Sequence, residues 1–115
     1  MFARKYLPFE RLSPDEVQSR ASQATGPAPL LLDVRELNEL RFEGYIDGAT
    51  HIPMNELPAR VAELPADVPI IVYCAHGTRS LAVAEWLTRQ GFASVKDLDG
   101  GLHAWKQRGL PVARF

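Results

Sequence analysis

The sequence predicts an α/β protein built on an open, mostly parallel sheet of about five short strands with helices on both faces. Short apolar runs alternate along the chain with segments of helical periodicity, and brief loops containing Gly and Pro separate them. This order is typical of parallel strands joined by crossover helices. With 115 residues, 46% of them hydrophobic, the chain suffices for one core, so we predict a single domain over residues 1–115.

The first half of the chain supplies three of the expected strands and three helices, at about residues 9–12, 14–24, 30–32, 36–42, 49–53 and 55–64. Ser13, followed by proline and then by Glu16, matches the capping-box pattern of a helix start. The apolar run Leu30–Leu32 is typical of a buried strand, and charges appear where it stops. Gly44 ends the second helix, and a short apolar run after an Asp-Gly turn gives the third strand.

The second half supplies the remaining strands and helices, at about residues 70–73, 81–90, 92–98 and 102–108. Ile70–Tyr73 follows a proline and is rich in β-branched residues, which favours a buried parallel strand. The helix after it has Ser80 as its expected cap and Gly91 as its stop signal. Gly109 ends the last helix.

Cys74, the only cysteine, directly follows the central strand and lies shortly before a helix. The first N–H groups of a helix lack partners and carry positive partial charge, so a loop wrapped around Cys74 would cradle an anion or a thiolate. Gly77 allows the turn, and the nearby Arg79 would help to lower the thiol pKa. We interpret Cys74 as a nucleophile; the alternative is a small buried hydrophobic residue.

Three charged residues, Asp33, Arg35 and Glu36, follow the strand that ends near residue 33. Since the carboxyl ends of parallel strands meet at one edge, we expect them on the same side of the sheet as Cys74. Their alternative role is structural, as partners that fix the loops. His51 lies beside apolar residues without a cysteine or second histidine at ligand spacing, so we predict no metal and no cofactor.

Charge and composition exclude several classes of partner. The formal net charge is −1 and the isoelectric point is near 6.3. The chain therefore lacks the excess of basic residues that would indicate binding to nucleic acid or to an anionic membrane surface. A single cysteine forms no internal disulfide, which suits a reducing compartment. The N-terminal segment has no run typical of a signal peptide and no segment is long enough to span a membrane, so we expect a cytoplasmic protein.

Several separate blocks coincide with one known family: Asp33–Glu36, Gly44–Pro53, Tyr73–Ser80, and Asp99–Gly101 with Trp105. On these blocks, from about residue 12 to residue 111, the chain resembles a single-domain rhodanese. The resemblance implies a sulfurtransferase whose Cys74 takes the sulfane sulfur of a donor such as thiosulfate and holds it as a persulfide. Cyanide, a thiol or a protein acceptor then removes it, as in covalent ping-pong catalysis.

The resemblance also assigns residues. Cys74 is the expected catalytic residue, Asp33 and Arg35 the expected supporting ones, and the substrate-binding loop comprises Ala75, His76, Gly77, Thr78, Arg79 and Ser80. Arg79 either holds the anion or turns away and fastens the loop. His76 either donates to the anion or points to solvent, and Thr78 and Ser80 are expected to stabilise the loop. The neutral Ala75 leaves thiosulfate and mercaptopyruvate open as donors.

Two other functions compete with this interpretation. Related phosphatases and arsenate reductases also place a cysteine at an amide-lined loop, but with one more residue before the arginine; here four residues separate Cys74 from Arg79, and Ser80 stands where their arginine would be. Non-catalytic binding modules of this fold usually lack the cysteine. Delivery of sulfur to a protein partner remains open beside catalysis with small molecules.

Overall fold

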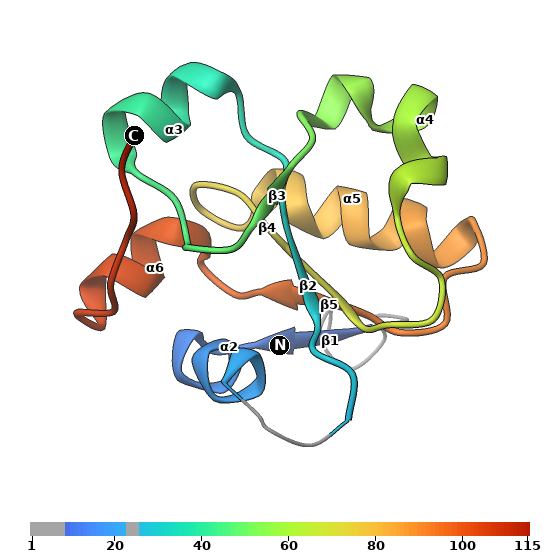
Figure 1. The fold of residues 1–115 in the computed structure, drawn as a ribbon, viewed down its shortest axis with the longest axis horizontal. Helices are drawn as coiled ribbons and strands as arrows, with labels where there is room; N and C mark the ends of the chain where they lie inside the picture. Colours follow the sequence, from blue (N-terminus) through green and yellow to red (C-terminus); the bar gives the residue numbers. More distant parts are fainter. Residues whose placement is uncertain (1–8, 23–25) are drawn as a thin grey trace.

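The computed structural model describes residues 9–22 and 26–115, and the five strands in this part form one parallel sheet (Figure 1). They are β1 (Glu10–Leu12), β2 (Leu30–Asp33), β3 (Thr50–His51), β4 (Ile70–Tyr73) and β5 (Val95–Leu98), in the order β1-β5-β4-β2-β3. This confirms the predicted fold class. The predicted absence of a signal peptide concerns residues mostly outside the described part. The helix expected over 14–24 has its last helical residue at Ala21, and residues 23 and 24 lie outside the described part.

Four helices connect the strands in the described residues: α2 (Pro14–Ala21), α3 (Leu37–Glu43), α4 (Leu57–Arg60) and α5 (Thr78–Arg89), with 3₁₀ turns η1 (Met54–Glu56) and η2 (Val61–Glu63) around α4. Helix α6 (Gly101–Gln107) follows the last strand. The predicted capping box is confirmed, because the Ser13 amide donates to Glu16 Oε1 at 2.8 Å and the Glu16 amide donates to Ser13 Oγ at 3.2 Å. None of the helices in the described residues is both long and apolar enough to cross a membrane.

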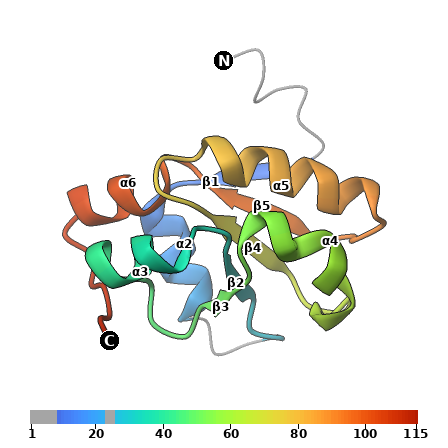
Figure 2. The same cartoon turned by 90° about the horizontal axis from the view of Figure 1, so that it is seen from above.

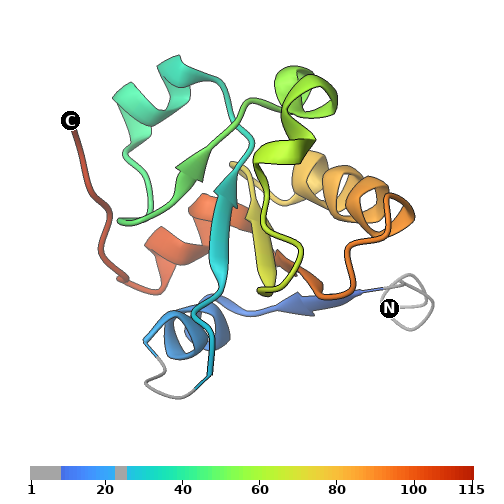
Figure 3. The same ribbon diagram turned by 45° about the vertical axis from the view of Figure 1, so that its right-hand side comes forward.

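The sheet separates two apolar cores. Side chains of α4 and α5 pack on one face and side chains of α2 and α6 on the other, and Figure 3 shows the two pairs on opposite sides of the strands. Strand β4 contributes to both cores, because successive side chains of a strand point to opposite faces. Val72 and Cys74 join the α5 side, and Ile71 and Tyr73 join the α6 side. Cys74 therefore begins its loop facing α5.

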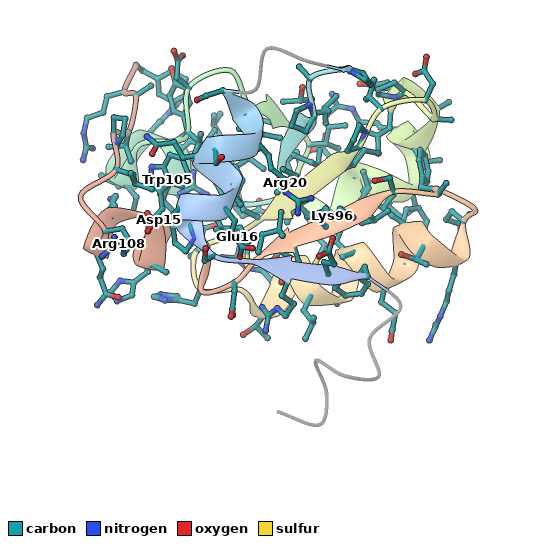
Figure 4. All side chains as sticks on the ribbon, turned by 90° about the horizontal axis from the view of Figure 1, so that it is seen from below. Asp15, Glu16, Arg20, Lys96, Trp105 and Arg108 are labelled. Atoms are coloured by element: carbon teal, nitrogen blue, oxygen red, sulfur yellow. The ribbon has the colours of Figure 1, made fainter. Side chains whose placement is uncertain are left out.

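Two surface charge pairs and the buried indole of Trp105 join neighbouring segments on the α2 side of the sheet (Figure 4). Asp15 on α2 faces Arg108 just beyond α6, with 2.9 Å between their charged atoms. Lys96 on β5 pairs with Glu10 on β1 at 2.9 Å. Trp105 Nε1 donates to the Pro111 carbonyl at 2.8 Å, which fixes the chain that follows α6. The Asp15–Arg108 pair thus joins α2 to the end of α6, and the Lys96–Glu10 pair joins β1 to β5.

Four predicted boundaries were wrong. The third strand, expected over 49–53, ends at His51. The helix expected over 55–64 is a short α-helix between two 3₁₀ turns, since Pro58 has no N–H to donate and the Leu57 amide bonds the Met54 carbonyl instead. β5 begins at residue 95 rather than 92. Helix α5 begins at Thr78, and its N-cap is Gly77 in the left-handed region (φ 95°) rather than Ser80.

Candidate active site

The loop that carries the cysteine leaves the carboxyl end of the fully buried strand β4 and enters α5. It lies between α3, α5 and α6 in Figure 1, and α3 and α6 share one end of the molecule in Figure 2, joined by a 3.1 Å pair between Lys106 and Glu43. Cys74 is 1% exposed. Asp33 of β2 is in register with Tyr73, so the strand end with the charged residues lies beside the loop, as expected.

Backbone amides of the loop surround the sulfur. The Gly77 amide donates to Cys74 Sγ at 3.1 Å and the Ser80 amide at 3.3 Å, and the Ser80 hydroxyl lies 3.4 Å from the same atom. Burial by itself raises the pKa of the Cys74 thiol. The hydrogen bonds from Ser80, Gly77 and His76 outweigh that effect, so the pKa lies below its ordinary value. The loop therefore favours the thiolate.

Glycines allow the loop and α6 to approach closely. A Cβ on Gly77 would lie 2.9 Å from Arg11 Nη2, and a Cβ on Gly101 would lie 2.5 Å from the Cys74 carbonyl oxygen. In the observed arrangement the Leu102 amide donates to the Cys74 carbonyl at 2.8 Å, and the His103 amide donates to the Ala75 carbonyl at 2.9 Å. The first turn of α6 thus holds the start of the loop.

Arg79 does not turn toward the sulfur. Its guanidinium makes a bidentate pair with Glu39 on α3, with distances of 2.8 and 2.7 Å. The hydrogen bonds from Arg79 are the largest cause that lowers the pKa of Glu39, to about 2, and Glu39 Oε2 also accepts from the Glu36 amide at 2.8 Å. Arg79 therefore ties the start of α5 to α3, one of the two orientations that the sequence left open.

Asp33 and Arg35 form a fully buried ion pair behind the loop. Arg35 Nη2 donates to Asp33 Oδ2 at 2.7 Å and to the Gly44 carbonyl at 2.8 Å, and the Arg35 amide donates to Asp33 Oδ1 at 3.0 Å. His51 Nε2 lies 2.6 Å from the Arg35 carbonyl oxygen. In the tautomer that carries its proton on Nε2, the ring donates to this carbonyl. The pair joins the end of β2 to the end of α3 and does not touch the sulfur.

A pocket of about 220 Å³ lies next to the loop, between α3 and α6. Its lining mixes cationic, imidazole, acidic and apolar groups: Arg35, Glu39, Glu43, Ala75, His76, Leu102, His103 and Lys106. The imidazoles of His76 and His103 lie 5.1 Å apart between ring centroids, and both residues are exposed. Within the described residues, no group of three or more His, Cys, Asp and Glu is placed to hold a metal ion.

Comparison with known proteins identifies the family. The family model for the rhodanese-like domain matches residues 13–108. The chain belongs to the rhodanese-like domain family. A sulfurtransferase of Allochromatium vinosum is 39% identical over 83 residues, which are 72% of this chain and 77% of that protein. The thiosulfate sulfurtransferase GlpE of Stutzerimonas stutzeri is 35% identical over 98 residues, 85% of each chain.

The fold agrees with a solved structure. A rhodanese-related protein from Thermoplasma volcanium superposes with a TM-score of 0.81 at 34% identity, over 90% of this chain and 97% of that chain. Within this rhodanese-like domain, the residues predicted for the site do not all face the sulfur. Ser80 and Gly77 contact it and are buried, Ala75 is half-buried, and His76 and Thr78 are exposed.

Sequence reasoning missed four residues that shape the site: Glu39, Asp97, Arg11 and the exposed His103. Glu39 lies in the first turn of the short helix α3, and its contact with Arg79 is visible only in the folded structure. Asp97 is completely buried within β5. The sequence predicted the strand there but did not predict that this carboxylate points inward. The available signal was the alternation along the strand: Asp97 lies on the same face as the apolar Val95, and a carboxylate buried on that face needs a partner.

Proposed function

We propose that this rhodanese-like protein is a sulfurtransferase that moves a sulfane sulfur from thiosulfate or a similar donor, through a Cys74 persulfide, to a cyanide or thiol acceptor. The observation that carries the proposal is the set of loop donors on Cys74 Sγ, with the Gly77 and Ser80 amides at 3.1 and 3.3 Å. Fixed N–H dipoles stabilise negative charge on sulfur without reorganising during the reaction. The family relatives named as sulfurtransferases support the same chemistry.

The first step is a displacement at sulfur. The Cys74 thiolate attacks the outer sulfur of thiosulfate, a new S–S bond forms, and the original S–S bond breaks with its electron pair leaving on sulfite. The protein then holds a persulfide whose negative charge lies on the terminal sulfur. In this proposal, the amides from Ala75 to Ser80 bind first the donor anion and then the persulfide.

The second step restores the thiolate. The acceptor attacks the terminal sulfur, the S–S bond to Cys74 breaks, and its electron pair returns to Sγ. Cyanide leaves as thiocyanate, whereas a thiolate acceptor, on a small molecule or on a protein, leaves as a persulfide. The pocket beside Ala75 is the space in which such an acceptor would approach, and His76 lies exposed at its edge.

In this proposal Arg79 acts by fastening the loop. Both of its terminal nitrogens already bond Glu39, so the donor is held by backbone amides, while the charge of Arg79 still favours an anion nearby. Asp33 and Arg35 support the strand end from behind. The same pairing disfavours a phosphatase, since an enzyme that binds a phosphate dianion needs a guanidinium directed into the loop.

The test is to treat the protein with thiosulfate and measure its intact mass. The wild type is expected to gain the mass of one sulfur atom, to lose it after cyanide is added, and to release thiocyanate. Cys74→Ser is expected to gain no mass from thiosulfate and to release no thiocyanate. Wild-type mass that stays unchanged with both thiosulfate and mercaptopyruvate would overturn the proposal.

Ala82→Ser serves as a control that adds a serine close in sequence to the loop while leaving the thiol in place, because residue 82 is exposed on α5. It tests whether an added hydroxyl on this helix by itself affects sulfur loading. We expect it to load sulfur as the wild type does.

A further inference from the structure

Asp97 is a buried carboxylate that the proposed reaction leaves without a role. It lies in β5 in register with Val72 of β4 and is 0% exposed. Its Oδ2 accepts from Arg11 Nε at 2.7 Å. Its Oδ1 is equally buried but has no hydrogen-bond partner among the described residues. Because an unpaired buried oxygen is costly, a donor within reach of Oδ1 is expected to be drawn to it.

Besides Arg11, the Ser80 hydroxyl acts as a hydrogen-bond donor toward this carboxylate, where it opposes the rise in pKa that burial causes. Ser80 is 0% exposed, its Oγ lies 3.4 Å from Cys74 Sγ, and the same hydroxyl acts on the Asp97 carboxylate. Burial raises the pKa of Asp97, while the Ser80 hydroxyl and Arg11 oppose that rise. A serine hydroxyl has a single proton to donate. It can therefore serve the sulfur or the carboxylate, but not both at once.

We propose that the Ser80 hydroxyl is a one-proton switch between Cys74 Sγ and the Asp97 carboxylate, and that Asp97 is a positioning residue that sets how strongly the site stabilises the thiolate. While Cys74 is a thiolate, the hydroxyl donates to the sulfur. When Sγ carries a proton or a second sulfur, it is no longer an anion, and the hydroxyl rotates about its C–O bond toward Asp97. No covalent bond changes in this rotation.

Arg11 keeps the two acceptors in place. Its side chain bonds Asp97, donates from Nη2 to the Gly77 carbonyl at 3.1 Å, and lies 3.4 Å from Asp99. Asp97 is thereby fixed to the loop that surrounds the sulfur. The other charges that act on these groups are Asp99 on Asp97 and Arg79 on Cys74.

The direction of each substitution follows from this arrangement. Ser80→Ala removes a donor to the thiolate and is expected to raise the thiol pKa by about one unit, since a hydrogen bond to a charged group has that order of strength. Asp97→Asn removes the competing anion, and its amide can donate to Ser80 Oγ. It is therefore expected to lower the thiol pKa by about half a unit or more.

The experiment measures the alkylation rate of Cys74 by iodoacetamide against pH, which reports this thiol directly because the chain has a single cysteine. In a protein that already carries Ser80→Ala, Asp97→Asn is expected to lower the Cys74 thiol pKa by no more than half as much as it does when Ser80 is present. Asp99→Asn is the control: it removes the same charge from the other carboxylate beside Arg11, and we expect a shift of less than about 0.3 unit. An equal Asp97→Asn shift with and without Ser80, or no shift, overturns the switch.

A second variant keeps the test decisive if Asp97→Asn does not fold. Arg11→Gln, at a partly exposed side chain, leaves the Asp97 charge without its ion pair, so the carboxylate competes harder for the hydroxyl. The thiol pKa is expected to rise more with Ser80 present than in the Ser80→Ala background. Equal rises contradict the proposal.

Only the persulfide half of the switch rests on the proposed function. Alkylation needs no sulfur donor, so the pKa shifts stand or fall separately from sulfur transfer. If the shifts appear as expected but thiosulfate adds no mass, the proposed function fails while the hydroxyl switch at the thiolate stands. If the protein gains mass from thiosulfate but the thiol pKa shifts are absent, the proposed function stands and the hydroxyl switch fails.

Discussion

Two arginine–carboxylate pairs flank the loop, and they differ in burial. Asp33 and Arg35 are fully buried, with distances down to 2.7 Å, whereas Arg79 and Glu39 have similar distances but side chains that are 35% and 31% exposed. A buried charge that loses its partner stays uncompensated, while an exposed one regains water. The comparison indicates that the first pair maintains the fold around the site and the second maintains the shape of the loop.

The largest expected effect comes from breaking the buried pair. Asp33→Ala leaves the Arg35 guanidinium buried without its carboxylate, so we expect the free energy of unfolding to fall by about 3–5 kcal/mol. Urea denaturation followed by circular dichroism measures this change. Arg108→Ala removes an exposed pair with Asp15 and serves as the control, with an expected loss below about 1 kcal/mol. Similar losses for both variants would contradict the distinction.

Breaking the partly exposed Arg79–Glu39 pair is expected to affect activity more than stability. Arg79→Ala should cost less than about 1 kcal/mol of unfolding free energy but reduce sulfur loading from thiosulfate. If Arg79 acts by fastening the loop, Glu39→Gln reproduces the loss in loading, because it breaks the same tie. If Arg79 binds the donor, Glu39→Gln frees the guanidinium and loading is retained or improved. Loading rates and thermal unfolding of both variants separate the two roles.

The smallest expected effect is the loss, at low pH, of the folding stability that the Arg79–Glu39 pair contributes. The pKa of Glu39 falls from 4.5 to about 2 in the folded protein because Arg79 donates to it. A lowered carboxyl pKa stabilises the folded state fully above pH 4.5, and this contribution is lost as the pH falls toward 2. We expect the stability difference between wild type and Glu39→Gln to shrink between pH 5 and pH 2.5, as measured by urea midpoints. A difference that stays constant would show that the pair contributes no pH-dependent stability.

Local patterns in the sequence predicted the parallel sheet, the capped helix α2 and the position of the loop after β4. Apolar runs, caps and glycines lie close together in sequence, so their signals are local. The direction of Arg79 was not predictable, because its partner Glu39 lies 40 residues away on another element. Ser80 fits a cap by composition, yet the turn at Gly77 starts α5 earlier and moves the Ser80 hydroxyl onto the sulfur.

The role of Asp97 was hidden for a related reason. In sequence it stands between Lys96 and Leu98 in a short strand, where two adjacent charged residues suggest an exposed segment. The structure turns it inward, where Arg11 and Ser80 act on it from β1 and α5. Three elements must assemble before this carboxylate faces the site, so local reasoning about any one of them does not find it.

The first turn of α6 fixes two peptide dipoles of the loop by bonding only their carbonyl ends. In a trans peptide the C=O and N–H bonds point in opposite directions. The Leu102 and His103 amides draw the Cys74 and Ala75 carbonyls toward α6, so the Ala75 and His76 amides of the same two peptide units point away from α6 and into the loop. The electric field at the sulfur therefore depends on a helix that is distant from Cys74 in sequence but bonded to its loop. A tilt of α6 would change that field without any change in the sequence of the loop.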